Sequence, residues 1–278
     1  MEEYVRYAFR AKDRTRPAAR EMIMMMARYG DHPFVFASQA DVKRFFARQG
    51  HEFAALVERC RKADSRVPMV ENLVPSNFVV DTRGKGSRVS IIDPQTGEEL
   101  SRVQGPGRLI WPDYGGAFEE AVRNFKRCLQ TASIGPFQSC TSSGVASIEA
   151  YIAHRARMYN AVHPDDQLVD SKGHKVAFDT KIDEWIPRMS GGRKLDRGGR
   201  RWADFRILRA FRDRAAIHLK GGGVGIEYAD LCALLNRFRH GIAGLLVDLH
   251  LHFSERIPCI IVRYAFLGDI ELVGEEEV

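Results

Sequence analysis

Five helical patterns follow one another along the second half of the chain. Within each pattern, apolar residues recur at spacings of three and four, which places them on one face of an α-helix. The patterns cover residues 117–132, 142–161, 178–191, 200–220 and 228–253. Amphipathic helices joined by short connections bury their apolar faces against one another. The second half is therefore predicted to form an all-α, up-and-down helical bundle.

The N-terminal part of the chain carries a different pattern. Helical periodicity at 18–30 and 38–63 is followed by β-branched runs within 76–103. The turn-forming sequences RGKG and DPQTG interrupt these runs, which predicts an antiparallel sheet of two or three strands. Glycine and proline concentrate in 104–116, which marks a boundary.

These patterns divide the chain into two parts. We expect an α+β protein, with a small α/β region of unknown role at 1–115 and the helical bundle at 116–278. A length of 278 residues fits one large or two ordinary domains.

Cysteine usage and hydropathy indicate the compartment. The five cysteines are scattered and never spaced as CxxC, which argues against a disulfide framework and against a cysteine zinc site. No apolar stretch reaches the about 18–20 residues that span a bilayer. The charged N-terminus lacks the apolar region of a secretory signal. We therefore expect a cytoplasmic protein that does not bind membranes.

Basic residues concentrate before and within the fourth helical pattern. From Arg193 to Lys220 the chain holds ten arginine and lysine residues but only three acids, Asp196, Asp204 and Asp213. Such a local excess favours a polyanionic partner such as RNA. The alternative interpretation is an ordinary solvated helix face.

Other candidate motifs are incomplete. The glycine-rich segments 82–88 and 220–225 lack the GxxxxGK[ST] pattern of a phosphate-binding loop, and we interpret them as a hairpin turn and a helix stop. His250 and His252 diverge by about 200° on a helix. We therefore expect surface histidines and no metal site. Isolated acids such as Glu149 and Asp204 cannot be paired as general acid and base from sequence alone.

One stretch, FRDRAAIHLKGGG at 211–223, places Arg212 six positions before His218. These two residue types suffice for RNA transesterification, because the 2′-hydroxyl is the nucleophile. Histidine moves protons near neutral pH, and the planar fork of arginine stabilises charge on the phosphorane oxygens. The expected products are a 2′,3′-cyclic phosphate and a 5′-hydroxyl.

The spacing leaves the arginine partner open. On an ideal helix Arg212 and His218 lie about 120° apart, whereas Arg214 and His218 share a face. Arg212 remains possible if the helix unwinds at its end, if the long side chain reaches around, or if two subunits contribute to one site.

The stretch resembles the Rx4–6H signature of the HEPN superfamily (higher eukaryotes and prokaryotes nucleotide-binding domain). Arg212, five intervening residues and His218 fit this pattern, and Asp213 stands where the family favours a polar residue; Arg214 does not fit. Segments 142–156 and 181–220 also resemble helices of such domains. The resemblance covers roughly residues 117–255.

The resemblance implies a four- to five-helix bundle and a homodimer in which two arginine–histidine pairs face each other. Many members are metal-independent ribonucleases of toxin–antitoxin, antiphage or RNA-decay systems. Other members lack the motif and serve as nucleotide-binding or scaffolding modules.

We therefore expect a metal-independent endoribonuclease without a cofactor. Its expected role is that of a toxin or of an antiphage or stress effector. His218 is the expected general acid and base, Arg212 the transition-state clamp, and Asp213 an orienting residue. The expected RNA contacts are Arg206, Arg209, Arg214 and Lys220. The alternatives are a non-catalytic RNA- or nucleotide-binding module, or a protein-interaction scaffold or antitoxin subunit that uses the apolar helix at 228–253.

Overall fold

The structure is a computed structural model. It describes residues 8–11, 54–55, 57–58, 61–62, 65–74, 78–81, 88–92, 99–104, 113–169, 176–217 and 226–273. The described residues form two units. The first contains those within 1–12, 111–253 and 268–278, and the second contains those within 13–110 and 254–267. The expected division placed a single boundary after residue 115. In the structure, residues 1–12 belong to the first unit and residues 254–267 to the second.

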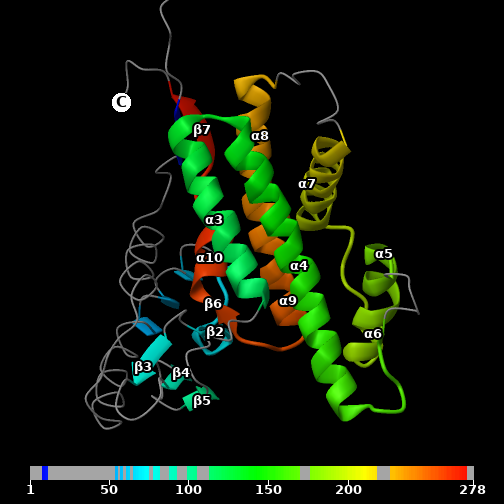
Figure 1. The fold of residues 1–278 in the computed structure, drawn as a ribbon. Helices are drawn as coiled ribbons and strands as arrows, with labels where there is room; N and C mark the ends of the chain where they lie inside the picture. The colour runs from blue at the N-terminus through cyan, green and yellow to red at the C-terminus, as the bar shows by residue number, and fades with distance from the viewer. Residues whose placement is uncertain are drawn as a thin grey trace, which may run out of the picture. The chain divides into compact units, whose positions relative to one another are not determined.

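The first unit is a helical bundle (Figure 1). Helix α3 (Asp113–Thr131) and helix α4 (Ile134–Val162) form a hairpin. The predicted helix at 142–161 begins eight residues earlier than expected. Pro136 lies in the first turn of α4, where its missing N–H costs no hydrogen bond.

The remaining helices of the first unit follow the predicted patterns closely. Helix α5 (Phe178–Thr180), the π-helical turn η2 (Lys181–Trp185) and helix α6 (Ile186–Met189) form one short run. Helix α7 spans Arg200–Ile217. Helix α8 (Tyr228–Phe238), the π-helical turn η4 (Arg239–Gly244) and helix α9 (Leu245–His252) are continuous. The helices α3, α4, α7 and α8–α9 run alternately up and down (Figure 1).

The core of the bundle is aromatic and aliphatic. Phe125 stacks on Phe238 of α8 at a centroid distance of 4.9 Å. Helix α4 buries one stripe that includes Val145, Ile148 and Ile152, because residues three and four apart share a helix face. Burial of this stripe holds α4 in the centre of the bundle.

Both ends of the described chain join this bundle. Strand β1 (Ala8–Ala11) pairs antiparallel with strand β7 (Ile270–Val273). The side chain of Asn236 on α8 exchanges two hydrogen bonds of 2.8 Å with the backbone of Ile270. The short ribbon is thereby attached to α8.

The second unit contains the predicted sheet. Strands β3 (Phe78–Asp81), β4 (Arg88–Ile92) and β5 (Glu99–Gln104) form a three-stranded antiparallel sheet in that order, which confirms a small antiparallel sheet.

A second strand pair and two short helical segments complete the described part of this unit. Strand β2 (Leu73–Val74) follows a short 3-10 turn, η1 (Val70–Asn72), and pairs parallel with β6 (Ile257–Pro258). Helix α10 (Cys259–Ala265) follows directly.

Some of the predicted segments cannot be compared with the structure. The predicted helix at 18–30 and both turn sequences lie outside the described residues, as does most of the predicted helix at 38–63. The described chain is thus mostly helical and of α+β class. Among its helices, none is long and apolar enough to cross a membrane.

Candidate functional site

Arg212 lies on the inward face of α7. Phe205 and Leu208 on the same helix are fully buried. Arg212 follows Phe205 by seven positions, almost two full turns, so both residues point in nearly the same direction. The Arg212 side chain is accordingly only 24% exposed and faces α4.

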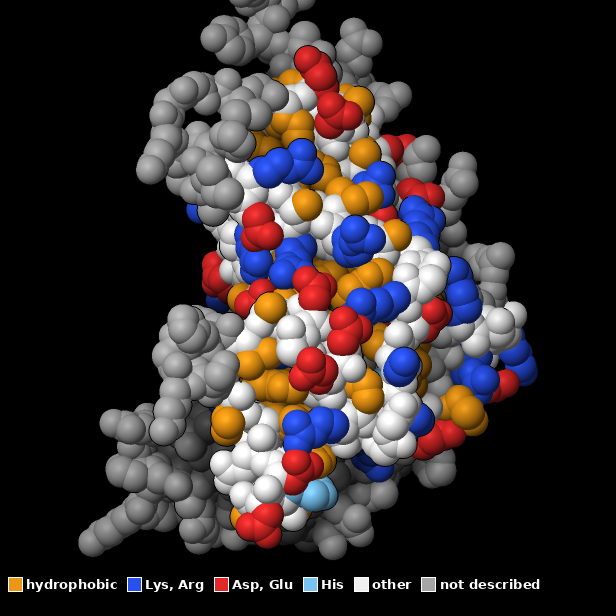
Figure 2. Space-filling model, turned by 90° about the vertical axis from the view of Figure 1, so that its right-hand side faces the viewer, with side chains coloured by type: hydrophobic (Ala, Val, Ile, Leu, Met, Phe, Trp, Pro, Cys, Tyr) orange, Lys and Arg blue, Asp and Glu red, His pale blue; other side chains and the backbone are white. Residues whose placement is uncertain are grey.

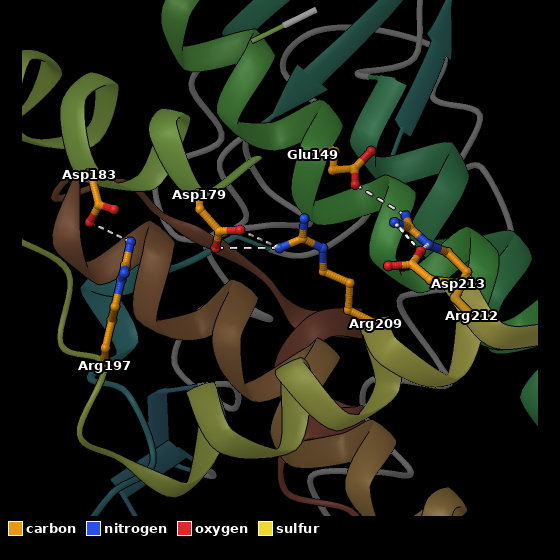
Figure 3. Close-up of polar contacts among 7 residues, drawn as sticks. All are labelled: Glu149, Asp179, Asp183, Arg197, Arg209, Arg212 and Asp213. Atoms are coloured by element: carbon orange, nitrogen blue, oxygen red, sulfur yellow. Dashed lines mark hydrogen bonds and ion pairs between the residues drawn. The ribbon is translucent and has the colours of Figure 1, made fainter. Parts of the chain in front are cut away.

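Two carboxylates hold the Arg212 guanidinium (Figure 3). Its Nη1 donates to Glu149 Oε1 on α4 at 3.1 Å, and its Nε donates to Asp213 Oδ1 at 2.9 Å. Burial lowers the pKa of Arg212, but the hydrogen bonds and charges of Glu149 and Asp213 outweigh that effect and raise the pKa above its usual value. Arg212 is therefore a permanently charged group in a fixed orientation.

Arg214 points elsewhere. It follows Phe205 by nine residues, which is about half a turn out of phase, and it is exposed. Among the described residues, its Nε donates to the carbonyl of Ala210 on its own helix, at 3.3 Å. The spacing left Arg212 and Arg214 as alternative partners of His218. Of these two, Arg212 is the one that contacts another helix.

The other expected site residues differ in their surroundings. Arg206 is exposed. Arg209 is held by Asp179 of α5 at 3.2 Å (Figure 3). Its guanidinium also lies 4.6 Å from the centre of the Phe178 ring. His218 and Lys220 lie outside the described residues, so the expected meeting of Arg212 with His218 stays a prediction.

Pairing reduces the basic character of the stretch from Arg193 to Lys220. Among the described residues, five of its arginines contact carboxylates, and most of these acids lie outside the stretch. The pairs are Arg197–Asp183, Arg200–Asp204, Arg201–Asp248, Arg209–Asp179 and Arg212–Glu149. On the face that Figure 2 shows, Lys and Arg side chains are interspersed with Asp and Glu, and the described residues there form no continuous basic patch. The local excess counted along the sequence overstates the charge of this surface.

The two histidines of α9 diverge as expected, but the expectation that both lie at the surface is wrong for His250. Its side chain is 1% exposed, its Nδ1 donates to the carbonyl of Leu246 at 2.8 Å, and the Tyr114 hydroxyl lies 3.5 Å from its Nε2. His252 instead contacts Ser190 at 3.0 Å. Within the described ranges, no cluster of His, Cys, Asp and Glu is suited to a metal ion.

Glu149 is the site residue that sequence reasoning left without a partner. It is the only Asp, Glu, Lys or Arg between Arg127 and Arg155. A lone carboxylate in such a long stretch is a signal for a specific partner, since the nearest cation on α4, Arg155, lies six positions away and not on the same helix face. That partner, Arg212, is 63 positions away.

The guanidinium of Arg212 retains donors for a ligand. Five N–H groups are available in arginine. The carboxylates lie beside Nε, Nη1 and Nη2, which leaves one hydrogen on each Nη group. The remaining Nη hydrogens suit the planar, two-point recognition of a phosphate. The two acids together carry more charge than Arg212, so a phosphate bound there needs further cations.

Comparisons with known proteins return no match: neither a family model, nor a curated protein, nor a solved structure matches this chain.

Proposed function

We propose that this chain is a metal-independent endoribonuclease with a HEPN-like bundle, and that Arg212 and His218 form its reaction centre. The observation that carries the proposal is the position of Arg212. It is an inward-facing arginine, oriented by Glu149 and Asp213, in the last turns of the helix that leads to His218. Such an arginine is suited to stabilise charge that develops on a phosphorane.

The chemistry requires a proton acceptor and a proton donor. The 2′-oxygen attacks the adjacent phosphorus while its proton passes to a base, and the 5′-oxygen leaves with a proton from an acid. In the homodimer one His218 serves each site in both roles, because the proton that it accepts from the 2′-oxygen can pass to the leaving 5′-oxygen. The other copy of the site also supplies cations in addition to Arg212, and the exposed Arg206 and Arg214 add phosphate contacts.

Product analysis tests the proposal. Purified protein is incubated with total cellular RNA and EDTA, and the fragment ends are identified by mass spectrometry. We expect fragments with 2′,3′-cyclic phosphate and 5′-hydroxyl ends at undiminished rate in EDTA. Intact RNA, or fragments with 3′-hydroxyl ends, would contradict the proposal.

The dimer has its own test. We expect sedimentation of the wild-type protein as a dimer. If each site takes its arginine and histidine from different subunits, mixing inactive Arg212→Ala and inactive His218→Ala protein restores part of the cleavage. A wild-type monomer that cleaves RNA would contradict the shared site.

Glu149 acts in this proposal as a positioning residue for Arg212. Replacement by alanine removes the bond to Nη1, and we expect kcat to fall about 10- to 100-fold, since small misplacements of a catalytic group cost rates of this order. Glutamine keeps an acceptor oxygen, so Glu149→Gln should recover most of kcat. KM should change less than kcat in both variants.

The control for Glu149 is Glu184, an exposed acid on η2. Glu184→Ala should cleave RNA like the wild type. Steady-state kinetics on one RNA hairpin compare the four proteins. A fully active Glu149→Ala protein would show that the contact with Arg212 serves no catalytic purpose.

The second candidate function is a non-catalytic RNA- or nucleotide-binding module, or an interaction scaffold. The observation that favours it is the double compensation of Arg212 by Glu149 and Asp213, which is also what a purely structural arginine between two helices requires. This candidate predicts that the wild-type protein binds RNA or a protein partner but leaves RNA intact.

A further inference from the structure

A buried carboxylate on α7, far from Arg212, is contacted by two arginines. The Asp204 side chain is 4% exposed, and a charge removed from water in this way requires compensation. Arg237 of α8 places Nη1 2.5 Å from one oxygen, and Arg200 places Nε 3.3 Å from the other. The carboxylate thus holds two guanidinium groups from different helices next to each other.

The two arginines keep much of their hydrogen-bonding capacity. Arg200 contacts Asp204 through Nε alone, and its side chain is 70% exposed. Its terminal Nη groups, which form the fork that binds oxyanions at two points, have no contact among the described residues. The Arg237 side chain is 37% exposed. Donors of both arginines are therefore accessible to a ligand.

The local charge is positive. One carboxylate faces two guanidinium groups, which leaves one positive charge. The neighbouring arginines do not change this balance, because Arg201 is paired with Asp248 and Arg239 with Asp269. His240 next to them adds no charge at neutral pH, because burial, together with the charges of Arg239 and Arg200, lowers its pKa to about 4.

We propose that Arg200 and Arg237, held together by Asp204, form a binding site for a phosphate group. The Nη fork of Arg200 binds two phosphate oxygens, and Arg237 binds a third. This site is distinct from the Arg212 centre, since twelve residues of α7 separate the two arginines, about 18 Å along the helix. The proposal does not depend on RNA cleavage, because binding of a phosphate requires no reaction.

Variants of Arg200 distinguish a phosphate-binding site from a simple ion pair between Arg200 and Asp204. Arg200 is largely exposed, so its bond to Asp204 contributes little to stability, and Arg237 remains to compensate the buried Asp204. Arg200→Gln is therefore expected to fold like the wild type. If Arg200 only pairs with Asp204, its loss changes no binding property; if it binds phosphate, the affinity falls.

The experiment titrates the 278-residue chain and follows binding by calorimetry. The probes are inorganic phosphate, adenosine monophosphate and a single-stranded RNA hexamer, so that free phosphate, a phosphomonoester and a phosphodiester are compared. We expect saturable binding of at least one probe, weakened at least about 10-fold in Arg200→Gln. Arg200→Lys, which keeps the charge but lacks the fork, should lie between the two.

The control is Arg127→Gln, which removes the charge of an exposed arginine on α3 and should bind each probe like the wild type. Absence of saturable binding by the wild type, or equal affinities of the wild type and Arg200→Gln, would overturn the proposal. RNA cleavage by Arg200→Gln is measured separately. A protein that binds phosphate but cleaves no RNA leaves this site in place and contradicts only the proposed ribonuclease.

Discussion

Replacement of His218 by alanine is expected to abolish RNA cleavage while RNA affinity stays within a few-fold of the wild-type value. A positioned general acid or base contributes about 10²- to 10⁴-fold to a rate, and here the same side chain type serves both proton transfers. The loss should therefore reach or exceed the upper part of that range. Affinity depends mainly on phosphate contacts with cations, which the substitution leaves unchanged. Single-turnover cleavage and equilibrium binding of the same RNA measure the two quantities.

Matched variants identify the groups involved. His163→Ala removes an exposed histidine at the end of α4 and should retain full cleavage. Arg212→Lys keeps the charge but loses the planar fork, and we expect about a 10²-fold loss. Arg214→Lys should stay within a few-fold of the wild type, because Arg214 faces solvent. Greater sensitivity at Arg214 than at Arg212 would assign the reaction centre to the other arginine, and cleavage by His218→Ala at the wild-type rate would remove histidine from the mechanism.

Helix positions were predictable because they depend on local spacing. The apolar stripe that includes Val145, Ile148 and Ile152 is readable from sequence and is buried as expected. The same periodicity explains why α7 presents Arg212 inward, since Phe205 and Leu208 define its buried face. Periodicity alone did not reveal the extension of α4 to Ile134, because Gly135 and Pro136 mimic a loop signal.

Partners across the bundle were not predictable, because they depend on how helices pack. Arg209 and Arg212 lie on one helix, yet their acids come from α5 and α4. Counting charge along the chain therefore misjudged the surface. The burial of His250 has the same origin: its helix is apolar on nearly every side, and only packing against Tyr114 and Tyr151 decides which side is covered.

Replacement of Gly241 by alanine is expected to destabilise the bundle by at least about 2 kcal/mol, because overpacking without space to relax costs of this order. Gly241 lies in the π-helical turn η4, where α7 approaches closely. A Cβ atom at this position would lie 2.6 Å from the backbone nitrogen of Phe205 and 2.7 Å from the carbonyl carbon of Asp204. Both atoms are main chain, so no side chain can rotate away and α7 must shift. Thermal unfolding followed by circular dichroism should show a midpoint lower by several °C.

The matched control is the same substitution on α4. A Cβ at Gly135 meets no atom within 4 Å, so Gly135→Ala gains helix propensity without a clash and should raise stability by up to about 1 kcal/mol. If the same glycine-to-alanine change lowers the stability at position 241 and raises it at position 135, the close contact with α7, and not the loss of a glycine, sets the effect. Because α7 also carries Arg212, the shift forced by Gly241→Ala should lower RNA cleavage even at temperatures where the protein is folded. Equal stability of the two variants would contradict the close approach of α7 to η4.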